Sequence, residues 1–287
     1  MLGLKRGEVL LLEHQNEWEI EAQKTIKALK VILGDIIVDI QHIGSTSIPQ
    51  ILAKPIIDIA VSVNAFCDVL ILEKALANKG FYYRKTDETD QLLFACGSYY
   101  DGTGDKQTHF IHFVLKDSMQ WINYINFRDY LTQNSAIAKE YEALKITLSK
   151  SAKDRAEYTL GKHNFITHIL RKALVKSYLG KTVYIEIDRP IGYIHKKEKY
   201  SLTYPINYGY IPNVLGGDGE ELDVYLLGVT EPINQADVHI IGIAHRENDV
   251  EDKLIAAPIG INFSKNEIEN AINFQEKYYK TTVEVIV

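Results

Sequence analysis

The sequence has little cysteine and no long apolar segment, and both absences narrow the classes of protein to consider. Among 287 residues there are two cysteines, Cys67 and Cys96, with no Cys-x-x-Cys spacing. This argues against a disulfide scaffold or a zinc ribbon and favours a reducing compartment. No run approaches the ~20 apolar residues of a membrane span, and the apolar run before Glu13 is shorter than the ~7–15 residues of a signal-peptide core. We therefore expect a cytoplasmic protein without a membrane partner.

The sequence also lacks a basic surplus. It has 32 Lys and Arg against 38 Asp and Glu, a net charge of −6, and no block of five or more basic residues, which argues against a nucleic-acid partner. Up to Gly180 there are 22 basic and 21 acidic residues, whereas from Lys181 there are 10 and 17. This asymmetry predicts a boundary near residues 176–182, with domains at 1–176 and 181–287.

The hydrophobic pattern changes its period at the same boundary. Before it, helical and strand patterns alternate, which predicts an α/β or α+β domain; the helices fall at 16–33 and within 118–176, and the strands at 36–44, 55–63 and 109–115. After it, period two dominates at 182–188, 223–229, 238–245 and 254–261. These segments predict a small β barrel or sandwich, followed by a helix over 264–279 that opens with a Ser-x-x-Glu capping box.

Two groups of carboxylates precede strands of the second domain. Asp218, Glu220, Glu221 and Asp223 lie within six residues, and a second group at 249–252 precedes Lys253. Each carboxylate pair at ~4 Å repels by about 1 kcal/mol in water and by more near a protein surface, so we expect a cation to neutralise them. Oxygen ligands without His or Cys favour Mg²⁺ or Mn²⁺. A solvated acidic turn is the alternative interpretation.

A tyrosine-rich segment adds donors to this domain. TYPINYGYIP carries Tyr204, Tyr208 and Tyr210, and the cations Arg189 and Lys196 lie nearby in the sequence. Core packing is the ordinary role of such tyrosines. Metal ions together with lysine and phenol donors are, however, the groups that transfer a phosphoryl group to water.

Residues 181–280, approximately, resemble the family I soluble inorganic pyrophosphatases through IDRPIG, YPINYGYIP, GDGEELDVYLLG and VEDKLIAAP, in that order. The resemblance implies an OB-like β-barrel with a C-terminal helix and Mg²⁺-dependent hydrolysis of inorganic diphosphate. It implies metal ligands at Asp218, Asp223, Asp249 and Asp252, a proton acceptor at Glu220, and phosphate-binding side chains at Tyr208, Lys253, Tyr278 and Lys196. The sequence departs from the family pattern at Glu220, one methylene longer than the family's aspartate, and the cation beside Tyr278 is displaced to Lys280.

A small-residue turn is the main feature of the first domain. QHIGSTSIPQILAKPIIDIAV places Gly44 and Ser45 between a strand and a short helix, and Asp58 on the next strand. Such a turn exposes backbone N–H groups to an anion, and a neighbouring carboxylate can hold the metal that accompanies phosphates. An ordinary helix cap is the alternative.

Residues 5–172, approximately, resemble the GrpB family through this turn and through Lys54, His109, His112, FRDYL, YEALK (Lys145) and EYTLGKHNFI. That family looks like a branch of the nucleotidyltransferase superfamily. The resemblance implies nucleotide binding by Gly44, Ser45, Lys54, Arg128 and Lys162 and a metal at Asp58. The second carboxylate of the superfamily's acid-x-acid pair is Ala60 here, so Glu13 or a histidine of HFIHF completes the site, or the domain binds a nucleotide without transfer. His109 and His112 cannot share one face of a strand, and at least one of them is expected to be structural.

The leading hypothesis is therefore an enzyme, an Mg²⁺-dependent inorganic diphosphatase fused to a GrpB-type nucleotidyltransferase-like domain. Its expected substrates are diphosphate and a nucleoside triphosphate, and a homo-oligomer is left open. One alternative is a regulatory protein that binds a nucleotide or a phosphorylated metabolite without chemistry. Another is an active nucleotidyltransferase with an inert β domain.

Overall fold

The computed structural model describes residues 1–86, 88–196, 201–216, 219–249 and 251–286. The chain divides into two compact units, Met1–Leu170 and Arg171–Val287. The division falls inside helix α8 (His163–Tyr178), earlier than the predicted boundary at 176–182. The reason is that Val175 and Tyr178, in the last turns of α8, pack into the hydrophobic core of the second unit.

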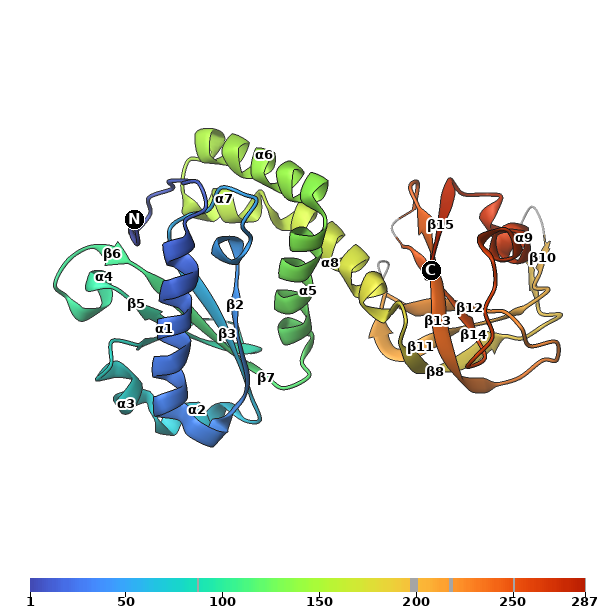
Figure 1. Ribbon diagram of the computed structural model, residues 1–287, viewed down its shortest axis with the longest axis horizontal. Coiled ribbons are helices and arrows are strands. Elements are labelled where there is room, and N and C mark those ends of the chain that lie inside the picture. Colours follow the sequence, from blue (N-terminus) through green and yellow to red (C-terminus); the bar gives the residue numbers. More distant parts are fainter. Residues whose placement is uncertain (87, 197–200, 217–218, 250, 287) are drawn as a thin grey trace. The chain divides into compact units, whose positions relative to one another are not determined.

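A five-stranded sheet forms the centre of the first unit (Figure 1). Its order is β2-β3-β7-β5-β4, in which β3 and β7 are parallel and the other neighbours are antiparallel. The strands are β2 (Ile37–Ile43), β3 (Ile57–Val63), β4 (Tyr82–Arg84), β5 (Gln91–Cys96) and β7 (His109–Leu115). The apolar patterns at 36–44, 55–63 and 109–115 thus predicted the three strands on one side of the sheet.

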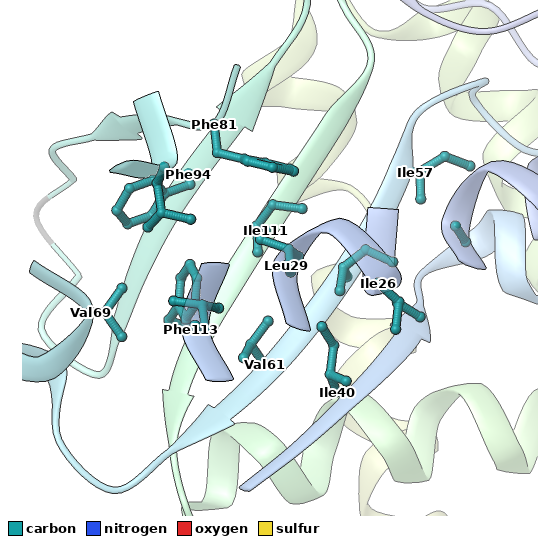
Figure 2. Packing of buried hydrophobic residues seen from close by; sticks show 14 of the residues in the cluster. Ile26, Leu29, Ile40, Ile57, Val61, Val69, Phe81, Phe94, Ile111 and Phe113 are labelled. Atoms are coloured by element: carbon teal, nitrogen blue, oxygen red, sulfur yellow. The ribbon is translucent and has the colours of Figure 1, made fainter. Parts of the chain in front are cut away.

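Helix α1 (Asn16–Leu33) covers one face of this sheet. Its apolar residues recur at helical spacing, and Trp18, Ile26 and Leu29 are buried, because a stripe with a period of 3.6 residues must face a core. Figure 2 shows Ile26 and Leu29 against Val61 of β3 and Ile111 of β7. The odd-numbered residues of β3 and β7 face this core, since side chains alternate along a strand.

The even-numbered residues of the same strands therefore face the opposite side, where α5 (Met119–Gln133) packs. A second cluster joins Leu131 of α5 to Tyr141 of α6 (Ser135–Ser151) and Ile169 of α8. This side of the sheet carries Asp58 and His112. The other elements of the unit are β1 (Leu4–Lys5), η1 (Gly34–Ile36), η2 (Ser45–Ser47), α2 (Phe66–Ile71), α3 (Glu73–Ala77), α4 (Ser98–Asp101), β6 (Lys106–Gln107) and α7 (Arg155–Leu160).

A closed barrel of five strands forms the second unit (Figure 1). The neighbours follow the circle β8-β11-β12-β14-β13 and back to β8, and β12 and β14 are its parallel pair. In chain order this is 1-2-3-5-4-1, the OB-type arrangement. The strands are β8 (Thr182–Arg189), β11 (Asn207–Leu215), β12 (Glu221–Leu226), β13 (Gln235–Arg246) and β14 (Lys253–Ala257). The short pair β9 (Ile194–Lys196) and β10 (Ser201–Thr203) lies outside this circle.

Helix α9 (Lys265–Glu276) follows the barrel, and β15 (Thr281–Val285) pairs with β13. Ser264 and Glu267 form the predicted capping box, each side chain bonding the other's backbone N–H. Ile268 and Ile272 of α9 are buried in the core that contains Tyr208 and Tyr225. The helix therefore packs on the outer face of the barrel, because the alternate residues of all five strands form a separate interior cluster.

Across the residues that the structure describes, we find no helix with the length and hydrophobicity needed to cross a membrane.

Candidate functional site

Asp223, Glu251 and Lys253 meet at the start of two neighbouring strands of the second unit. Asp223 lies on β12 and Lys253 on β14. These strands pair Val224 with Leu254, so Asp223 and Lys253 each lie one position before a paired residue. The Lys253 ammonium forms ion pairs with both carboxylates. Lys253 is only 5% exposed; burial would lower its pKa, but the two carboxylates outweigh burial and raise it. The lysine therefore stays charged between the two carboxylates.

Gly216, which follows β11, lies directly against Glu251. A Cβ atom at Gly216 would lie 2.0 Å from Oε1 of Glu251, so any larger residue there would displace this carboxylate. The Gly216 N–H donates to the Glu220 carbonyl at 2.7 Å, which closes the loop. Glu220 itself is exposed. Asp218, the ligand predicted inside this loop, lies outside the described residues.

Tyr208 and Arg189 are close to the same carboxylate group. Tyr208 is fully buried, and burial together with the charge of Asp223 raises the pKa of its phenol. The Arg189 guanidinium lies 4.9 Å from the centre of the Tyr208 ring and donates to the Tyr204 hydroxyl at 3.0 Å. Tyr208 thus keeps its proton at neutral pH, beside a permanent cation.

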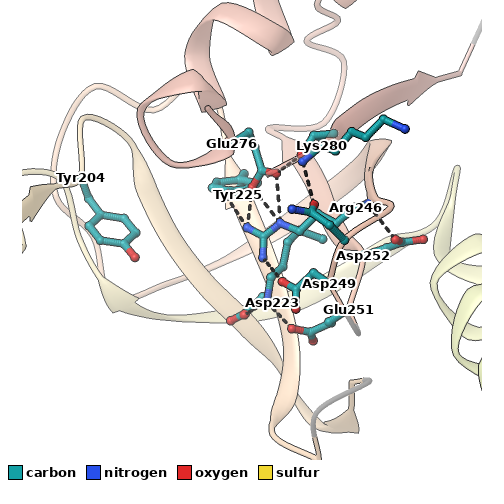
Figure 3. A network of polar contacts seen from close by, with 12 residues as sticks. Tyr204, Asp223, Tyr225, Arg246, Asp249, Glu251, Asp252, Glu276 and Lys280 are labelled. Atoms are coloured by element: carbon teal, nitrogen blue, oxygen red, sulfur yellow. Dashed lines mark hydrogen bonds and ion pairs between the residues drawn. The ribbon is translucent and has the colours of Figure 1, made fainter. Parts of the chain in front are cut away.

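A separate network surrounds Arg246 of β13 (Figure 3). Its guanidinium donates to Glu276 and, at 2.8 Å, to Asp249, and it stacks on the Tyr279 ring at 3.7 Å. Burial would raise the pKa of Glu276, but hydrogen bonds from Arg246, Thr281 and Tyr225 lower it. Asp249, a predicted metal ligand, is therefore ion-paired with an arginine.

Asp252 is directed away from Asp223. Its carboxylate lies 2.7 Å from Nδ1 of His245 and 3.5 Å from Nζ of Lys172, and it accepts the Arg246 N–H. Neighbouring residues of an extended chain point to opposite sides, which separates Asp252 from Lys253. Glu251, which the resemblance did not select, shares the Lys253 ammonium with Asp223. Glu251 lies two residues before Lys253, and side chains two apart on an extended chain point to the same side. This spacing in the sequence could have identified Glu251.

Two more predicted residues lie at the surface. Tyr278 is 53% exposed, whereas its neighbour Tyr279 is the residue that contacts Arg246. Lys196 ends β9 and is exposed, next to residues that the structure does not describe. The structure does not bring either of them to the Asp223 group.

The donor set at Asp223 fits a hard cation. Within the described ranges no three His, Cys, Asp or Glu side chains form a group that could hold a metal ion. Mg²⁺, however, is commonly held by one or two carboxylates, with waters and substrate phosphates as its other ligands. Asp223 and Glu251 supply two such carboxylates at one strand end.

In the first unit, Gly44 packs directly against Asp58. The backbone pairs Ile43 with Asp58 across β2 and β3, and Gly44 follows with φ of 71°. A Cβ atom at Gly44 would lie 2.6 Å from Oδ2 of Asp58. Glycine is therefore required both by the backbone angle and by the carboxylate.

Gly44→Ala is expected to destabilise the first unit more than Gly34→Ala. Both glycines have positive φ, 71° and 53°, so both substitutions strain the backbone, but a Cβ at Gly34 would meet open space. The excess should be about 1–3 kcal/mol, the usual cost of overpacking. Urea unfolding of the two variants measures the difference, and equal losses would mean that Asp58 moves aside freely.

His112 occupies the strand position next to Ala60, where the second carboxylate is missing. Ala60 and His112 are register partners of β3 and β7, and Nε2 of His112 lies 3.4 Å from Oδ1 of Asp58. Gln91 and the Tyr124 hydroxyl lie 3.0 and 3.2 Å from its Nδ1. His112 is thus the histidine of HFIHF that approaches Asp58.

The other histidine, His109, has a structural role. Its ring lies on the α1 side of the sheet, 3.1 Å from the Thr25 hydroxyl, and is 7% exposed. Arg128 is likewise used inside the fold, because its guanidinium donates to Gln41 and to the backbone carbonyl of His42. Among the described residues that line the two cavities near Asp58, Arg128 is absent. The Arg128 guanidinium therefore holds β2 at His42, two residues before Gly44.

Two adjoining cavities open beside Asp58. One, of about 180 Å³, is lined by Ser45, Lys54, Lys145 and Lys162, and the other measures about 660 Å³. Asp58 and Lys162 line both. Lys145 is 2% exposed, and burial and the charge of Lys162 lower its pKa to about 7.

Comparison with known proteins identifies both units. Residues 8–172 match the family model described as GrpB protein, and residues 175–284 match the one described as inorganic pyrophosphatase. The chain is 38% identical over 175 residues to the glutamate-rich protein GrpB of Alkalihalophilus pseudofirmus, which is 60% of this chain and 99% of that protein. A crystal structure of conserved protein GrpB from Enterococcus faecalis is similar with a TM-score of 0.54 and 32% identity, covering 59% of this chain and 99% of that one.

The match to curated pyrophosphatases is shorter. The inorganic pyrophosphatase of Helicobacter pylori is 35% identical over 61 residues, 20% of this chain and 35% of that protein. The chain spans about a third to a half of the curated pyrophosphatases that it matches. Both resemblances and the fold class predicted from the sequence are confirmed: a GrpB-like α+β domain is followed by an OB-like barrel with a C-terminal helix.

Proposed function

We propose that this chain, which belongs to the GrpB family through residues 8–172 and carries an inorganic pyrophosphatase domain at residues 175–284, hydrolyses inorganic diphosphate in that second domain. The observation that supports the proposal best is the group of Asp223, Glu251 and Lys253. The two carboxylates at this strand end suit a metal ion, and the buried ammonium suits the phosphate oxygens of a diphosphate that is bound with the metal.

The described side chains suggest how the reaction proceeds. The oxygen of a water forms a bond to one phosphorus, the bond from that phosphorus to the bridging oxygen breaks, and the bridging oxygen leaves with the second phosphate. In the proposal, Lys253 and the protonated Tyr208 hold phosphate oxygens, and Glu220 accepts the proton of the attacking water. Charged and hydroxyl donors fixed before the reaction stabilise the charge that develops in it.

Asp223 and Glu251 would hold the metal, together with Asp218 if its side chain reaches them. A bound Mg²⁺ would lower the pKa of a bound water and neutralise phosphate charge. Mn²⁺ has the same preference for oxygen ligands. Asp249 and Asp252 are weaker candidates, because Arg246 and His245 hold their carboxylates.

For the first domain we propose a nucleotidyltransferase-like role that rests on the Gly44 turn and Asp58. Transfer of a nucleotide would release diphosphate, and its hydrolysis by the same chain would draw the transfer forward. His112, beside Asp58, is our candidate for the role of the missing carboxylate at Ala60.

The test is phosphate release from diphosphate by the purified full-length chain. We expect release with Mg²⁺, a slower or equal rate with Mn²⁺, and none with EDTA, measured as free phosphate over time. If neither metal supports release above the rate in buffer, the hydrolase proposal fails. Calorimetric binding of a nucleotide without any phosphate product would then favour the regulatory alternative.

A further inference from the structure

Arg246 is a cation buried beside the candidate site of the second unit. Ala244 of β13 pairs with Lys253 of β14, and paired residues share one face of a sheet. Side chains two apart on a strand point to the same side, so Arg246 lies on the face that carries Lys253, about 7 Å further along its strand. Its guanidinium also donates at 3.4 Å to the hydroxyl of Tyr225, which lies two residues after Asp223 on β12. Arg246 therefore borders the group of Asp223 and Lys253.

Oxygen atoms surround the Arg246 guanidinium (Figure 3). Glu276 accepts from Nε at 3.0 Å and from Nη2 at 2.5 Å, Nη2 also donates to Tyr225, and Asp249 accepts from Nη1 at 2.8 Å. Carboxylate and other oxygen atoms gathered in this way are the ligands that a divalent cation such as Mg²⁺ takes. A guanidinium, which cannot lose its charge in a protein, occupies this position instead.

Stability alone does not account for this arrangement. The side chains of Arg246 and Glu276 are only 2% and 6% exposed, and replacing a buried ion pair by apolar side chains of similar volume often leaves a protein equally or more stable. Glu276 and Asp249 carry the same charge, so they repel each other unless a cation lies between them. The position therefore requires a cation, and a side chain of the protein supplies it.

The other predicted ligand of this acidic segment is also held by protein groups. One oxygen of Asp252 lies 2.7 Å from Nδ1 of His245 and 3.5 Å from Nζ of Lys172, and the other oxygen accepts the Arg246 N–H. Both oxygens of Asp252 thus have protein partners. A metal ion would have to displace a histidine and a lysine to bind there.

Asp223 differs from these carboxylates in its access to water and in its partner. Its side chain is 21% exposed, and Mg²⁺ usually keeps several waters when it binds to a protein, so a hydrated ion can approach it. Its partner Lys253 has a compact charge on a flexible stem, whereas several oxygen atoms fix the planar fork of Arg246 at once. Lys253 can therefore make room for a metal ion more readily than Arg246 can.

We propose that Arg246 takes the place of a metal ion in this domain. Its guanidinium neutralises Glu276 and Asp249, so the second unit binds a single divalent ion, at Asp223 and Glu251. Arg246 is then a positioning residue that supplies a permanent positive charge where a second ion would otherwise be required. The inference rests on the proposed diphosphatase function, because it concerns the metal requirement of the same site.

The test counts the Mn²⁺ ions that the full-length chain binds without substrate, by electron paramagnetic resonance. The wild type is compared with Asp223→Asn and Asp249→Asn, so any ion held by the first domain is common to all three proteins. We expect Asp223→Asn to bind one ion fewer than the wild type, and Asp249→Asn to bind the same number with the same affinity. Thermal melts without metal check that both variants fold.

The two proposals fail in different ways. Loss of an ion in Asp249→Asn, while the wild type hydrolyses diphosphate, would overturn the role of Arg246 and leave the proposed function in place. An unchanged count in Asp223→Asn would contradict the metal site of the proposed function and, with it, the single-ion inference.

Removal of the guanidinium should create a metal site. Arg246→Ala leaves Glu276, Asp249 and Tyr225 around the space that the guanidinium filled, so this variant should bind one more Mn²⁺ than the wild type. Mn²⁺ should also raise its melting temperature more than that of the wild type, because a ligand that binds only the folded state stabilises it. Arg246→Lys keeps the positive charge and should gain no ion.

A merely structural arginine predicts a different result. In that case Arg246→Ala would gain no ion, and Mn²⁺ would shift its melting temperature no more than it shifts that of the wild type; this result would overturn the proposal. If Arg246→Ala does not fold with or without Mn²⁺, the ion count of Asp249→Asn decides alone.

Discussion

Asp223→Ala is expected to reduce the rate of diphosphate hydrolysis at least about 100-fold, the scale on which the loss of one fixed electrostatic group is felt in catalysis. Asp223 is both a proposed metal-holding carboxylate and a partner of the buried Lys253. Its removal therefore weakens cation binding and releases the ammonium from its position. Initial rates of phosphate release at saturating Mg²⁺ measure the effect.

Two further variants show whether the effect belongs to the site. Asp237→Ala removes an exposed carboxylate from β13 of the same barrel and should leave the rate unchanged. Asp223→Asn keeps the shape of the side chain but not its charge, so it should lose activity while the melting temperature stays near that of the wild type. An active Asp223→Asn variant would show that this carboxylate is not needed.

Arg246→Met should destabilise the second unit by about 3–5 kcal/mol, the cost of breaking a buried ion pair from one side. Arg246 is 4% exposed and Glu276 6% exposed. Without the guanidinium, the buried Glu276 carboxylate still accepts hydrogen bonds from the Tyr225 and Thr281 hydroxyls but has lost its counter-charge. Urea unfolding, followed by circular dichroism, measures the loss.

The double variant Arg246→Met/Glu276→Gln tests the cause. It removes both charges and should be more stable than Arg246→Met alone. Lys280→Met provides the surface comparison, because the Lys280–Glu247 ion pair is largely exposed; exposed pairs contribute no more than about 1 kcal/mol. If Arg246→Met costs as little as Lys280→Met, the buried network does not stabilise the barrel.

Much of the fold could be predicted where one local pattern decides the structure. The helical spacing over 16–33 and the apolar run over 109–115 became α1 and β7 with the same bounds, because each follows a single period over its whole length. The capping box at Ser264 is equally local. The strand predicted over 254–261 ends at Ala257, since Pro258 has no N–H to continue the ladder.

The sites depend on residues that only the folded chain brings together. The resemblance selects Asp252 through a motif, whereas in the folded chain Glu251 contacts Lys253 and Asp252 contacts His245. Lys145 lies on an ordinary amphipathic helix, and nothing near it in the sequence marks the cavity that it lines. His112 meets Asp58 because β3 and β7 are parallel neighbours in a particular register, which no local pattern specifies.

The parallel pairing of β12 and β14 also determines the stage of folding at which Asp223 and Lys253 come together. These strands are separated in the chain by β13, so Asp223 and Lys253 can meet only after β13 has crossed the barrel. Contacts between such distant segments form late in folding, because the chain must be ordered before they repay the entropy lost. A partly folded second unit therefore has its carboxylates scattered along open strands. The group of Asp223, Glu251 and Lys253, on which the proposed diphosphatase activity rests, therefore forms in the same step that closes the barrel.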